Sequence, residues 1–387
     1  MTEQRHTQIS NLQRSYLVGR TMKNNLGGVA CHAYFEFEGK NLNVEAFQKA
    51  WEAVVAGHFM TSAKIKDDGT ACSSDTGFLK SLFIFDLSKE EEAAAAATME
   101  DCRKNSSHRK MEVARGQGIG GILFLLPGKK HRLCFDIDLA VCDVNGIQSL
   151  LNELGTRYAK KDYSRGEILP IPQRNEIARQ EIAVNPIIPD YGNNVGELSG
   201  CSYGSFDYKL TEEESLRMKE YFEGTGGDLF SGMLFLLAKS SSFQELSVNI
   251  PYFSEASGWD PVSDNTKIFW LNLDKKDLHL GRLQTAIRQK LAEEEKKYHN
   301  SSGIVPVVYS YNQNGIFLNV DFRNNIGNLT FMISQTPNVC LDVQLFNMVD
   351  GILISFVYPK EMEGVEKIKE WFNQYTGEIK ECVANGK

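Results

Sequence analysis

ISQTPNVCLDVQ, at residues 333–344, is the most informative stretch of this chain. Its apolar second half, around Asp342 and Gln344, is typical of a strand. Because side chains alternate along a strand, Asp342 and Gln344 point to the same face. An acid and an amide placed there either hold a reacting carbonyl group or, on an antiparallel edge, face solvent. Three polar residues lead into this strand: Ser334, Gln335 and Thr336.

A second stretch, DLAVCD at residues 138–143, ends a predicted strand and precedes a predicted helix. Asp136 and Asp138 share one face of strand 131–139. A carboxylate near a strand end is a general base, or it is solvated or paired. On the residues alone we prefer structural pairing. Four apolar residues share the opposite face: Leu133, Phe135, Ile137 and Leu139.

Composition and charge narrow the class of protein. The 387 residues are 42% apolar and 24% charged, as in soluble globular proteins with a full core. A net charge of −8 argues against a nucleic-acid-binding protein and against a polybasic membrane-surface protein. No run approaches the roughly 18 consecutive apolar residues of a transmembrane helix. We therefore expect no nucleic-acid partner and no membrane partner.

Cysteine and histidine usage argues for an intracellular protein without a metal. The eight cysteines are scattered and form no Cys-x-x-Cys pair. With no secretory signal at the first residues, free thiols in a reducing cytoplasm are expected, so the predicted localisation is cytoplasmic. The seven histidines show no metal-ligand spacing. Glycine-rich nucleotide loops, the Gly-x-Ser-x-Gly elbow and His-Glu-x-x-His are all missing.

Prolines divide the chain into two halves. Four of the ten prolines lie between positions 170 and 189, where regular structure is unlikely to form. We place an N-terminal lobe at 1–168, a crossover linker at 169–196 and a C-terminal lobe at 197–387. Each half mixes strands and helices, which predicts an α/β (α+β) fold with a cleft between two similar lobes. The predicted strands are 33–37, 78–87, 119–126, 131–139, 246–253, 267–273, 305–311, 339–345 and 352–357. The predicted helices are 42–55, 88–103, 147–158, 211–224, 230–241, 280–298 and 365–383.

Several motifs in order along the chain resemble one known family. Residues 9–20, ISNLQRSYLVGR, are similar to Leu-Thr-x-x-Gln-x-Ala-Tyr-x-x-Gly-Arg, and Asp138 with Asp143 fits Asp-x-x-x-x-Asp-x-x-Ser. Residues 306–310, PVVYS, are similar to Pro-Val-Val-Phe-Thr. Residues 334–344 are similar to Ser-Gln-Thr-Pro-Gln-Val-x-Leu-Asp-x-Gln. These are motifs of the heterocyclization domains of nonribosomal peptide synthetases, a branch of the condensation-domain family, and the resemblance spans nearly the whole chain.

The resemblance implies a fold, partners and a reaction. The fold is a V-shaped pair of chloramphenicol-acetyltransferase-like lobes around a central tunnel. The tunnel receives phosphopantetheine arms from a donor and an acceptor peptidyl carrier protein, and the chain itself binds no cofactor and no metal. The donor brings an acyl or peptidyl thioester, and the acceptor brings carrier-bound Cys, Ser or Thr. The family joins the two by an amide bond and then cyclises with loss of water to a thiazoline or oxazoline, as in siderophore-like natural products.

The resemblance also suggests roles for individual residues. Asp342 is the expected acid/base of cyclodehydration, because loss of water needs proton transfer near the carbonyl. Ser310 is expected to hydrogen-bond Asp342 or substrate, and Gln344 to hold the oxyanion or orient Asp342. Asp138 stays open between tunnel lining and catalysis, whereas Asp143 is expected to shape the turn by pairing with an arginine. Six residues are expected along the tunnel: Gln13, Tyr16, Arg20, Ser334, Gln335 and Thr336.

The chain departs from the family pattern at four places. Gly146 stands where the family has Ser, and Ser310 where it has Thr. The segment between Tyr298 and Val305 is too short for the helix that usually precedes Pro-Val-Val. The family's Arg-His-x-Met/Leu motif is GHFM at residues 57–60.

These departures leave other functions open besides a complete heterocyclase. One alternative is an enzyme that performs only condensation or only cyclodehydration. Another is a non-catalytic module that binds carrier proteins. A histidine-based condensation mechanism is not possible here, because Asp138 and Leu139 occupy the two histidine positions of the His-His-x-x-x-Asp-Gly motif.

Overall fold

The computed structural model describes residues 6–73, 81–164, 166, 168–171, 194–253, 258–294, 304–312 and 315–386. Most of the predicted linker, residues 172–193, and the shortened segment 299–303 lie outside the described residues. In the described part of the chain, no helix is long and apolar enough to cross a membrane.

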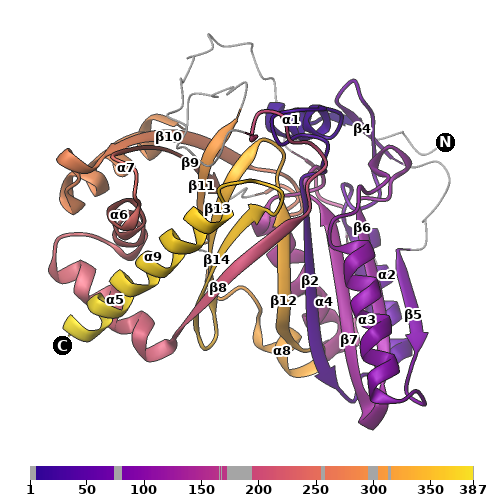
Figure 1. Cartoon of the computed structure of the whole chain (residues 1–387). Coiled ribbons are helices and arrows are strands. Elements are labelled where there is room, and N and C mark those ends of the chain that lie inside the picture. The colour runs from indigo at the N-terminus through magenta and orange to yellow at the C-terminus, as the bar shows by residue number, and fades with distance from the viewer. Residues whose placement is uncertain are drawn as a thin grey trace.

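The elements follow one another in a mixed order (Figure 1). The strands of the N-terminal half are β1 (His6–Gln8), β2 (His32–Lys40), β3 (Lys64–Ile65), β4 (Thr70–Cys72), β5 (Leu82–Asp86), β6 (Ile119–Leu126) and β7 (Lys130–Asp138). Its helices are α1 (Asn11–Gly19), α2 (Val44–Gly57), α3 (Glu92–Ser106) and α4 (Val144–Lys160). The later strands are β8 (Tyr203–Thr211), β9 (Glu245–Phe253), β10 (Thr266–Asp274), β11 (Val305–Asn312), β12 (Asn328–Gln335), β13 (Val339–Met348) and β14 (Gly351–Pro359). The later helices are α5 (Glu212–Gly224), α6 (Leu229–Ser240), α7 (Leu280–Glu294), α8 (Val320–Asn325) and α9 (Val365–Asn385).

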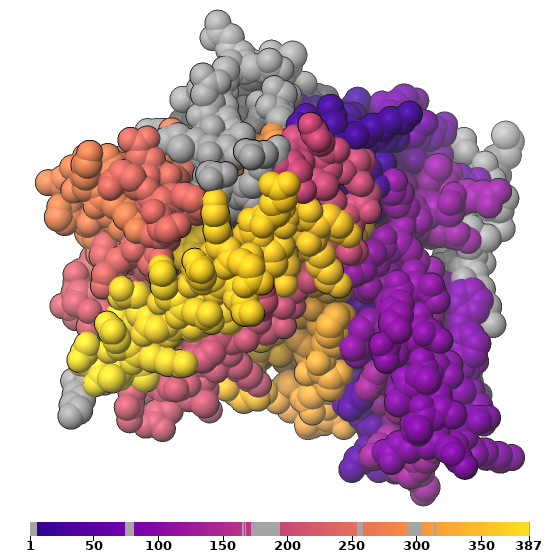
Figure 2. Space-filling model, in the orientation of Figure 1, coloured from indigo at the N-terminus to yellow at the C-terminus, as the bar shows by residue number. Residues whose placement is uncertain are grey.

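Two large sheets form the framework. One has the strand order β12-β2-β7-β6-β5, and the other has the order β10-β9-β11-β13-β14-β8. In the second sheet β11 pairs in parallel with both β9 and β13, while the outer pairs are antiparallel. The first sheet takes its edge strand β12 from the C-terminal half of the chain, and β12 lies beside β2 in Figure 1. Figure 2 likewise shows the segment around α8 against the N-terminal half.

Alternation along the strands decides what faces the helices and what faces the space between the sheets. In β11 and β13, Tyr309, Val343 and Leu345 belong to one core cluster with residues of α6 and α9. The residues that alternate with them, Ser310, Asp342 and Gln344, line a cavity. Strand pleating therefore supplies polar groups to the cavity and apolar groups to the core with the same two strands.

In the N-terminal sheet, Phe35, Leu133 and Phe135 pack with Phe47 and Leu150 of α2 and α4. Tyr34 and Cys134, on the opposite face, pack toward Ala95 and Met99 of α3. The prediction that Leu133, Phe135 and Ile137 share one face of β7 is thus confirmed.

Most predicted elements are confirmed with shifted ends. The hairpin predicted at 119–126 and 131–139 is the antiparallel pair β6 and β7. Seven of the described helices and strands were not predicted: α1, α8, β1, β3, β4, β8 and β12. Residues 334–336, expected as a polar lead into the next strand, differ in the structure: Ser334 and Gln335 end strand β12, which pairs with β2. The two-lobe boundaries stay a proposal.

Candidate functional site

A cavity of about 240 Å³ lies between the two sheets, with α1 on one side. Its walls carry three carboxyl groups, those of Asp143, Asp264 and Asp342. Lys, Arg and His are absent from the described residues that line it. Seven predicted site residues line this cavity: Tyr16, Asp143, Ser310, Ser334, Thr336, Asp342 and Gln344.

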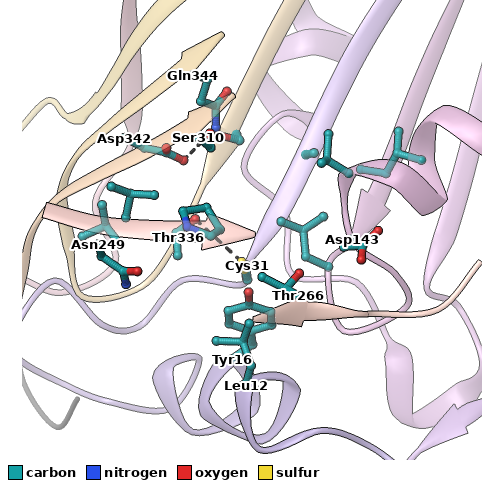
Figure 3. Close-up of a pocket in the computed structure, with 18 of the residues that line it drawn as sticks. Leu12, Tyr16, Cys31, Asp143, Asn249, Thr266, Ser310, Thr336, Asp342 and Gln344 are labelled. Carbon is teal, nitrogen blue, oxygen red and sulfur yellow. Dashed lines mark hydrogen bonds between the residues drawn. The ribbon is translucent and has the colours of Figure 1, made fainter. Parts of the chain in front are cut away.

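Asp342 and Gln344 form an acid–amide pair on one wall (Figure 3). They lie two residues apart in β13, so both point into the cavity. The Nε2 group of Gln344 donates to Asp342 Oδ2 at 2.7 Å and to Ser334 Oγ at 2.7 Å. Both protons of this amide are therefore used, which favours orienting Asp342 over holding an oxyanion. Gln344 Oε1 and Asp342 Oδ1 are buried and have no hydrogen-bond partner in the structure.

The protonation of Asp342 follows from its surroundings. The residue is 8% exposed, and burial raises the pKa of its carboxyl group to about 7, against the lowering effect of the Gln344 hydrogen bond. A carboxyl group with this pKa is present in both protonation states near neutral pH, as a general acid or base requires. Its Oδ1 atom is buried and has no hydrogen-bond partner in the structure, so the carboxyl group keeps one oxygen that no other described residue uses.

Ser310 lies on β11, the strand next to β13. The parallel register places it opposite Gln344, while Val308 lies opposite Asp342. Ser310 thus lines the cavity beside Gln344, two residues further along the sheet than Asp342 (Figure 3). Its expected hydrogen bond to Asp342 or to substrate stays a prediction.

Asn249 is a cavity residue that the sequence analysis missed. It lies on β9, in the row that also holds Val308 of β11 and Asp342 of β13. Asn249 is 8% exposed, and its Oδ1 atom has no hydrogen-bond partner in the structure. The alternation of strand 246–253 was visible, but nothing in it indicated that Asn249 and Asp342 share a row.

Tyr16 and Cys31 lie between the two walls (Figure 3). Cys31 Sγ donates to Thr336 Oγ1 at 3.7 Å. Burial raises the pKa of Tyr16 and of Cys31, and the cavity carboxyl groups add to both shifts. Both side chains are therefore neutral near pH 7, and the Cys31 thiol serves as a hydrogen-bond donor.

Asp143 begins helix α4 on the opposite wall. Its Oδ1 accepts from Gly146 N at 3.0 Å, and its Oδ2 accepts from Asn265 N at 2.8 Å. The arginine that the resemblance implied as its partner is not among these contacts, so the turn is shaped by helix capping and by the segment that carries Asn265. Burial and the neighbouring Asp264 raise the pKa of Asp143 to about 7.

Close packing explains why residue 146 is a glycine, which the sequence alone did not indicate. A Cβ atom at this position would lie 2.5 Å from Cys142 Cβ and 3.2 Å from the carbonyl oxygen of Pro261. A serine therefore does not fit here without movement of the backbone.

Asp138 and Arg20 form a buried ion pair, with Asp138 Oδ2 3.0 Å from Arg20 Nη1. Asp138 is 1% exposed and also accepts from Ala140 N, while Arg20 Nη2 donates to Met111 O. Burial raises the pKa of Asp138, and the guanidinium of Arg20 counteracts that rise. Neither residue lines the cavity, so the geometry favours structural pairing for Asp138 and for Arg20.

Two further residues predicted for the tunnel also lie outside the cavity lining. Gln13 closes a capping box with Ser10 at the start of α1 and donates to Ala140 O at 2.7 Å. Gln335 is 1% exposed and donates to His108 O. Their contacts connect α1 and β12 to neighbouring loops.

The sequence and the fold of the chain are similar to those of several known proteins. Pyochelin synthetase PchE from Pseudomonas aeruginosa is 27% identical over 395 residues, 90% of this chain and 27% of that protein. Phenyloxazoline synthase MbtB from Mycobacterium tuberculosis is 22% identical over 392 residues, 90% of this chain and 28% of that protein. The cyclization-docking bidomain of EpoB from Sorangium cellulosum has a TM-score of 0.79 and 18% identity, over 98% of this chain and 85% of that one.

These similarities support a cyclization-type or condensation-type domain of the nonribosomal peptide synthetases. The mixed fold predicted from the sequence is confirmed by the EpoB bidomain and by solved condensation domains. No protein-family model matches the sequence. The domain spans about a third or less of the length of these curated relatives.

Proposed function

We propose that this domain catalyses heterocyclization on carrier-bound substrates in the cytoplasm. An acyl or peptidyl thioester on a donor carrier is joined to Cys, Ser or Thr on an acceptor carrier. The new amide is then cyclised to a thiazoline or oxazoline. The phosphopantetheine arms belong to the carriers, and the domain supplies the cavity in which they meet.

The observation that carries this proposal is the buried Asp342 carboxyl group in the cavity wall, which is oriented by Gln344 and has one oxygen without a hydrogen-bond partner. Amide formation needs little chemical help, since the amine attacks the thioester carbon and the thiolate leaves once the two are held together. Cyclisation is harder, because the side-chain thiol or hydroxyl adds to an amide carbon and the amide oxygen must leave as water. With a pKa of about 7, Asp342 can take the proton of the attacking thiol or hydroxyl and pass it to the amide oxygen, which becomes a hydroxyl group. As the C=N bond of the ring forms, the amide nitrogen gives up its proton, and Asp342 can carry that proton to the hydroxyl group, which leaves as water.

Intact-protein mass spectrometry of the acceptor carrier tests the proposal. The domain is mixed with an acyl-loaded donor carrier and a cysteine-loaded acceptor carrier, and is compared with Asp342→Asn, which keeps the shape of the side chain. We expect acyl transfer followed by loss of one water with the native domain, and acyl transfer alone with the variant. Acyl transfer without water loss by the native domain would identify a condensation-only enzyme. No transfer with Cys, Ser or Thr would favour a carrier-binding module.

A further inference from the structure

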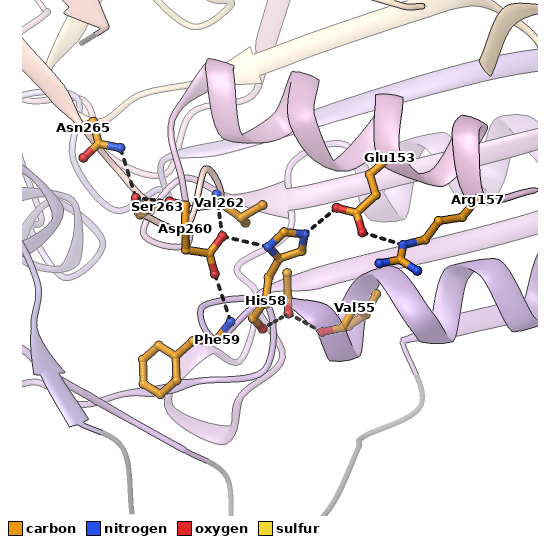
Figure 4. A network of polar contacts seen from close by, with 10 residues as sticks. Val55, His58, Phe59, Glu153, Arg157, Asp260, Val262, Ser263 and Asn265 are labelled. Atoms are coloured by element: carbon orange, nitrogen blue, oxygen red, sulfur yellow. Dashed lines mark hydrogen bonds and ion pairs between the residues drawn. The ribbon is translucent and has the colours of Figure 1, made fainter. Parts of the chain in front are cut away.

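His58 is held between two carboxyl groups far apart in the sequence (Figure 4). It directly follows helix α2 and is 8% exposed. Its Nδ1 atom lies 2.7 Å from Asp260 Oδ1, and its Nε2 atom lies 2.8 Å from Glu153 Oε2. One side chain thus bridges α2, α4 and the segment 258–265 that precedes β10.

Both carboxyl groups, those of Glu153 and Asp260, also accept hydrogen bonds from other residues. Glu153 Oε1 accepts from Arg157 Nε at 2.5 Å, one turn further along α4. Asp260 is fully buried, and its Oδ1 also accepts from Val262 N at 2.9 Å. His58 is the cation that the structure places against the buried Asp260 carboxylate.

The geometry requires a charged imidazole. A neutral histidine has one N–H group and can donate to one carboxylate, whereas both ring nitrogens of His58 face carboxylate oxygens. Burial opposes the charge, but the hydrogen bonds to Asp260 and Glu153 outweigh it and raise the pKa of His58 to about 9. Without that charge the Asp260 carboxylate would be buried and unpaired, which is costly.

The contacts continue from Asp260 to the cavity wall (Figure 4). Ser263 Oγ donates to Asp260 O at 2.9 Å, and Asn265 Nδ2 donates to Ser263 Oγ at 3.0 Å. The backbone N–H of Asn265 donates to Asp143, at the start of α4. The neighbours of Asn265, Asp264 and Thr266, line the cavity directly.

We propose that protonated His58 is a positioning residue that clasps segment 258–266 to α2 and α4, and thereby sets the cavity wall formed by Asp264, Thr266 and Asp143. The clasp itself follows from the contacts above. Its effect on the reaction rests on the proposed function.

The pH dependence has a defined sign. The charged groups that face His58 are Asp260 from segment 258–265 and Glu153 from α4, and Arg157 faces Glu153. Because the pKa of His58 is raised on folding, the stabilisation is fully present below its ordinary value and is lost as the pH rises through about 9. Segment 258–266 should therefore loosen in alkaline solution before the sheets do.

Hydrogen exchange measured by mass spectrometry tests the clasp on the full chain. The variants are His58→Gln, the double variant H58Q/D260N, in which two neutral amides replace the charged pair, and Glu45→Gln, which breaks an exposed ion pair of α2 as a control. At about pH 7 we expect H58Q to speed exchange across 262–266 by roughly tenfold or more, with β14 unchanged. The double variant should restore protection, and Glu45→Gln should change nothing. In the native chain, the protection of residues 262–266 should fall between about pH 8 and 10. Protection here means the slowing of exchange after correction for the intrinsic exchange rate at each pH.

Unchanged exchange across 262–266 in H58Q, equal loosening of β14, or no recovery in the double variant would overturn the clasp. The carrier assay then tests its consequence. If the clasp positions the cavity wall, H58Q lowers the rate of product formation and H58Q/D260N recovers it. Altered exchange in H58Q with full product formation would overturn the positioning role. Absence of product from the native domain, with the exchange pattern intact, would instead refute the proposed function alone.

Discussion

Asp342 and Asp143 are both buried carboxyl groups whose pKa is raised to about 7, yet their contacts separate their roles. Asp143 uses both oxygens to accept backbone N–H groups. Asp342 uses one oxygen for Gln344 and has no hydrogen-bond partner for the other, which is also buried. A raised pKa therefore accompanies a helix cap with both oxygens bonded in one case and a carboxyl group with one unbonded oxygen in the other.

The pH dependence of water loss should report Asp342. If the protonated carboxyl group delivers the proton to the departing hydroxyl, the rate of cyclodehydration falls about tenfold per pH unit above pH 7. Asp342→Asn should lower this rate by about 100-fold or more and remove the titration. The measurement is single-turnover mass spectrometry across pH, with amide formation followed in the same samples. A water-loss step that titrates identically in the variant would exclude Asp342 as the group involved.

Asp342→Asn should also change stability in a pH-dependent direction. The folded-state pKa lies above that of the unfolded chain, so stability from this group is full below about 3.8 and is lost as the pH rises toward 7. The amide carries no such penalty, and the variant should melt on the order of 2 °C higher at pH 8. Thermal melts at pH 8 and pH 4 compare the two proteins, and a variant that melts lower at pH 8 would show that the carboxylate is stabilising.

Gly146→Ser restores the residue of the related family but should destabilise this chain. The new Cβ would meet Cys142 Cβ at 2.5 Å, and overpacking of this kind costs about 1–3 kcal/mol. Gly377→Ser in α9 is the matched control, because nothing lies within 4 Å of a Cβ there. Chemical denaturation gives the free energy of unfolding of each variant. Equal values for Gly146→Ser and Gly377→Ser would show that Cys142 moves aside.

At the scale of elements, the ion pair between Arg20 and Asp138 joins the end of α1 to the end of β7. Four residues predicted for catalysis or the tunnel, Gln13, Arg20, Asp138 and Gln335, hold these elements and β12 together instead of lining the cavity. The walls of the cavity thus depend on a layer of polar contacts behind them.

Replacing Arg20 alone should destabilise the protein more than replacing both Arg20 and Asp138. Arg20→Leu leaves the Asp138 carboxylate buried without its cation, at a cost of about 3–5 kcal/mol. The double variant R20L/D138N should recover a large part of that loss. Denaturant titration provides the free energies of unfolding, and additive losses in the double variant would argue that the two side chains do not act as a pair.

At the scale of the whole molecule, β12 makes the two halves of the chain interdependent. It forms the edge of the N-terminal sheet, pairs antiparallel with β2, and is followed by Thr336 and β13 at the cavity. This strand therefore links the sheet of the N-terminal half to the wall that carries Asp342 and Gln344.

A fragment of residues 1–168 should not form a stable monomer. Without β12, the hydrogen-bonding edge of β2 is open and the apolar residues that β12 covers are exposed, which favours association. Size-exclusion chromatography and circular dichroism of the fragment check this. A monomeric fragment with a cooperative melt would show that the N-terminal half is complete without β12.

Alternation and motifs within single segments were enough to predict most strands and helices, the faces of β7 and β13, and the pairing of Asp342 with Gln344 on one side. These features depend on neighbours in sequence. Asn249 beside the row of Asp342, β12 in the N-terminal sheet, and His58 between Glu153 and Asp260 depend on residues about 90–300 positions apart. Local patterns do not contain such distances, because loop closure places those residues together only when the two sheets assemble. The same assembly decides which carboxyl groups are fully bonded. Asp143 caps a helix and Asp138 pairs with Arg20, whereas Asp342 keeps one oxygen without a hydrogen-bond partner.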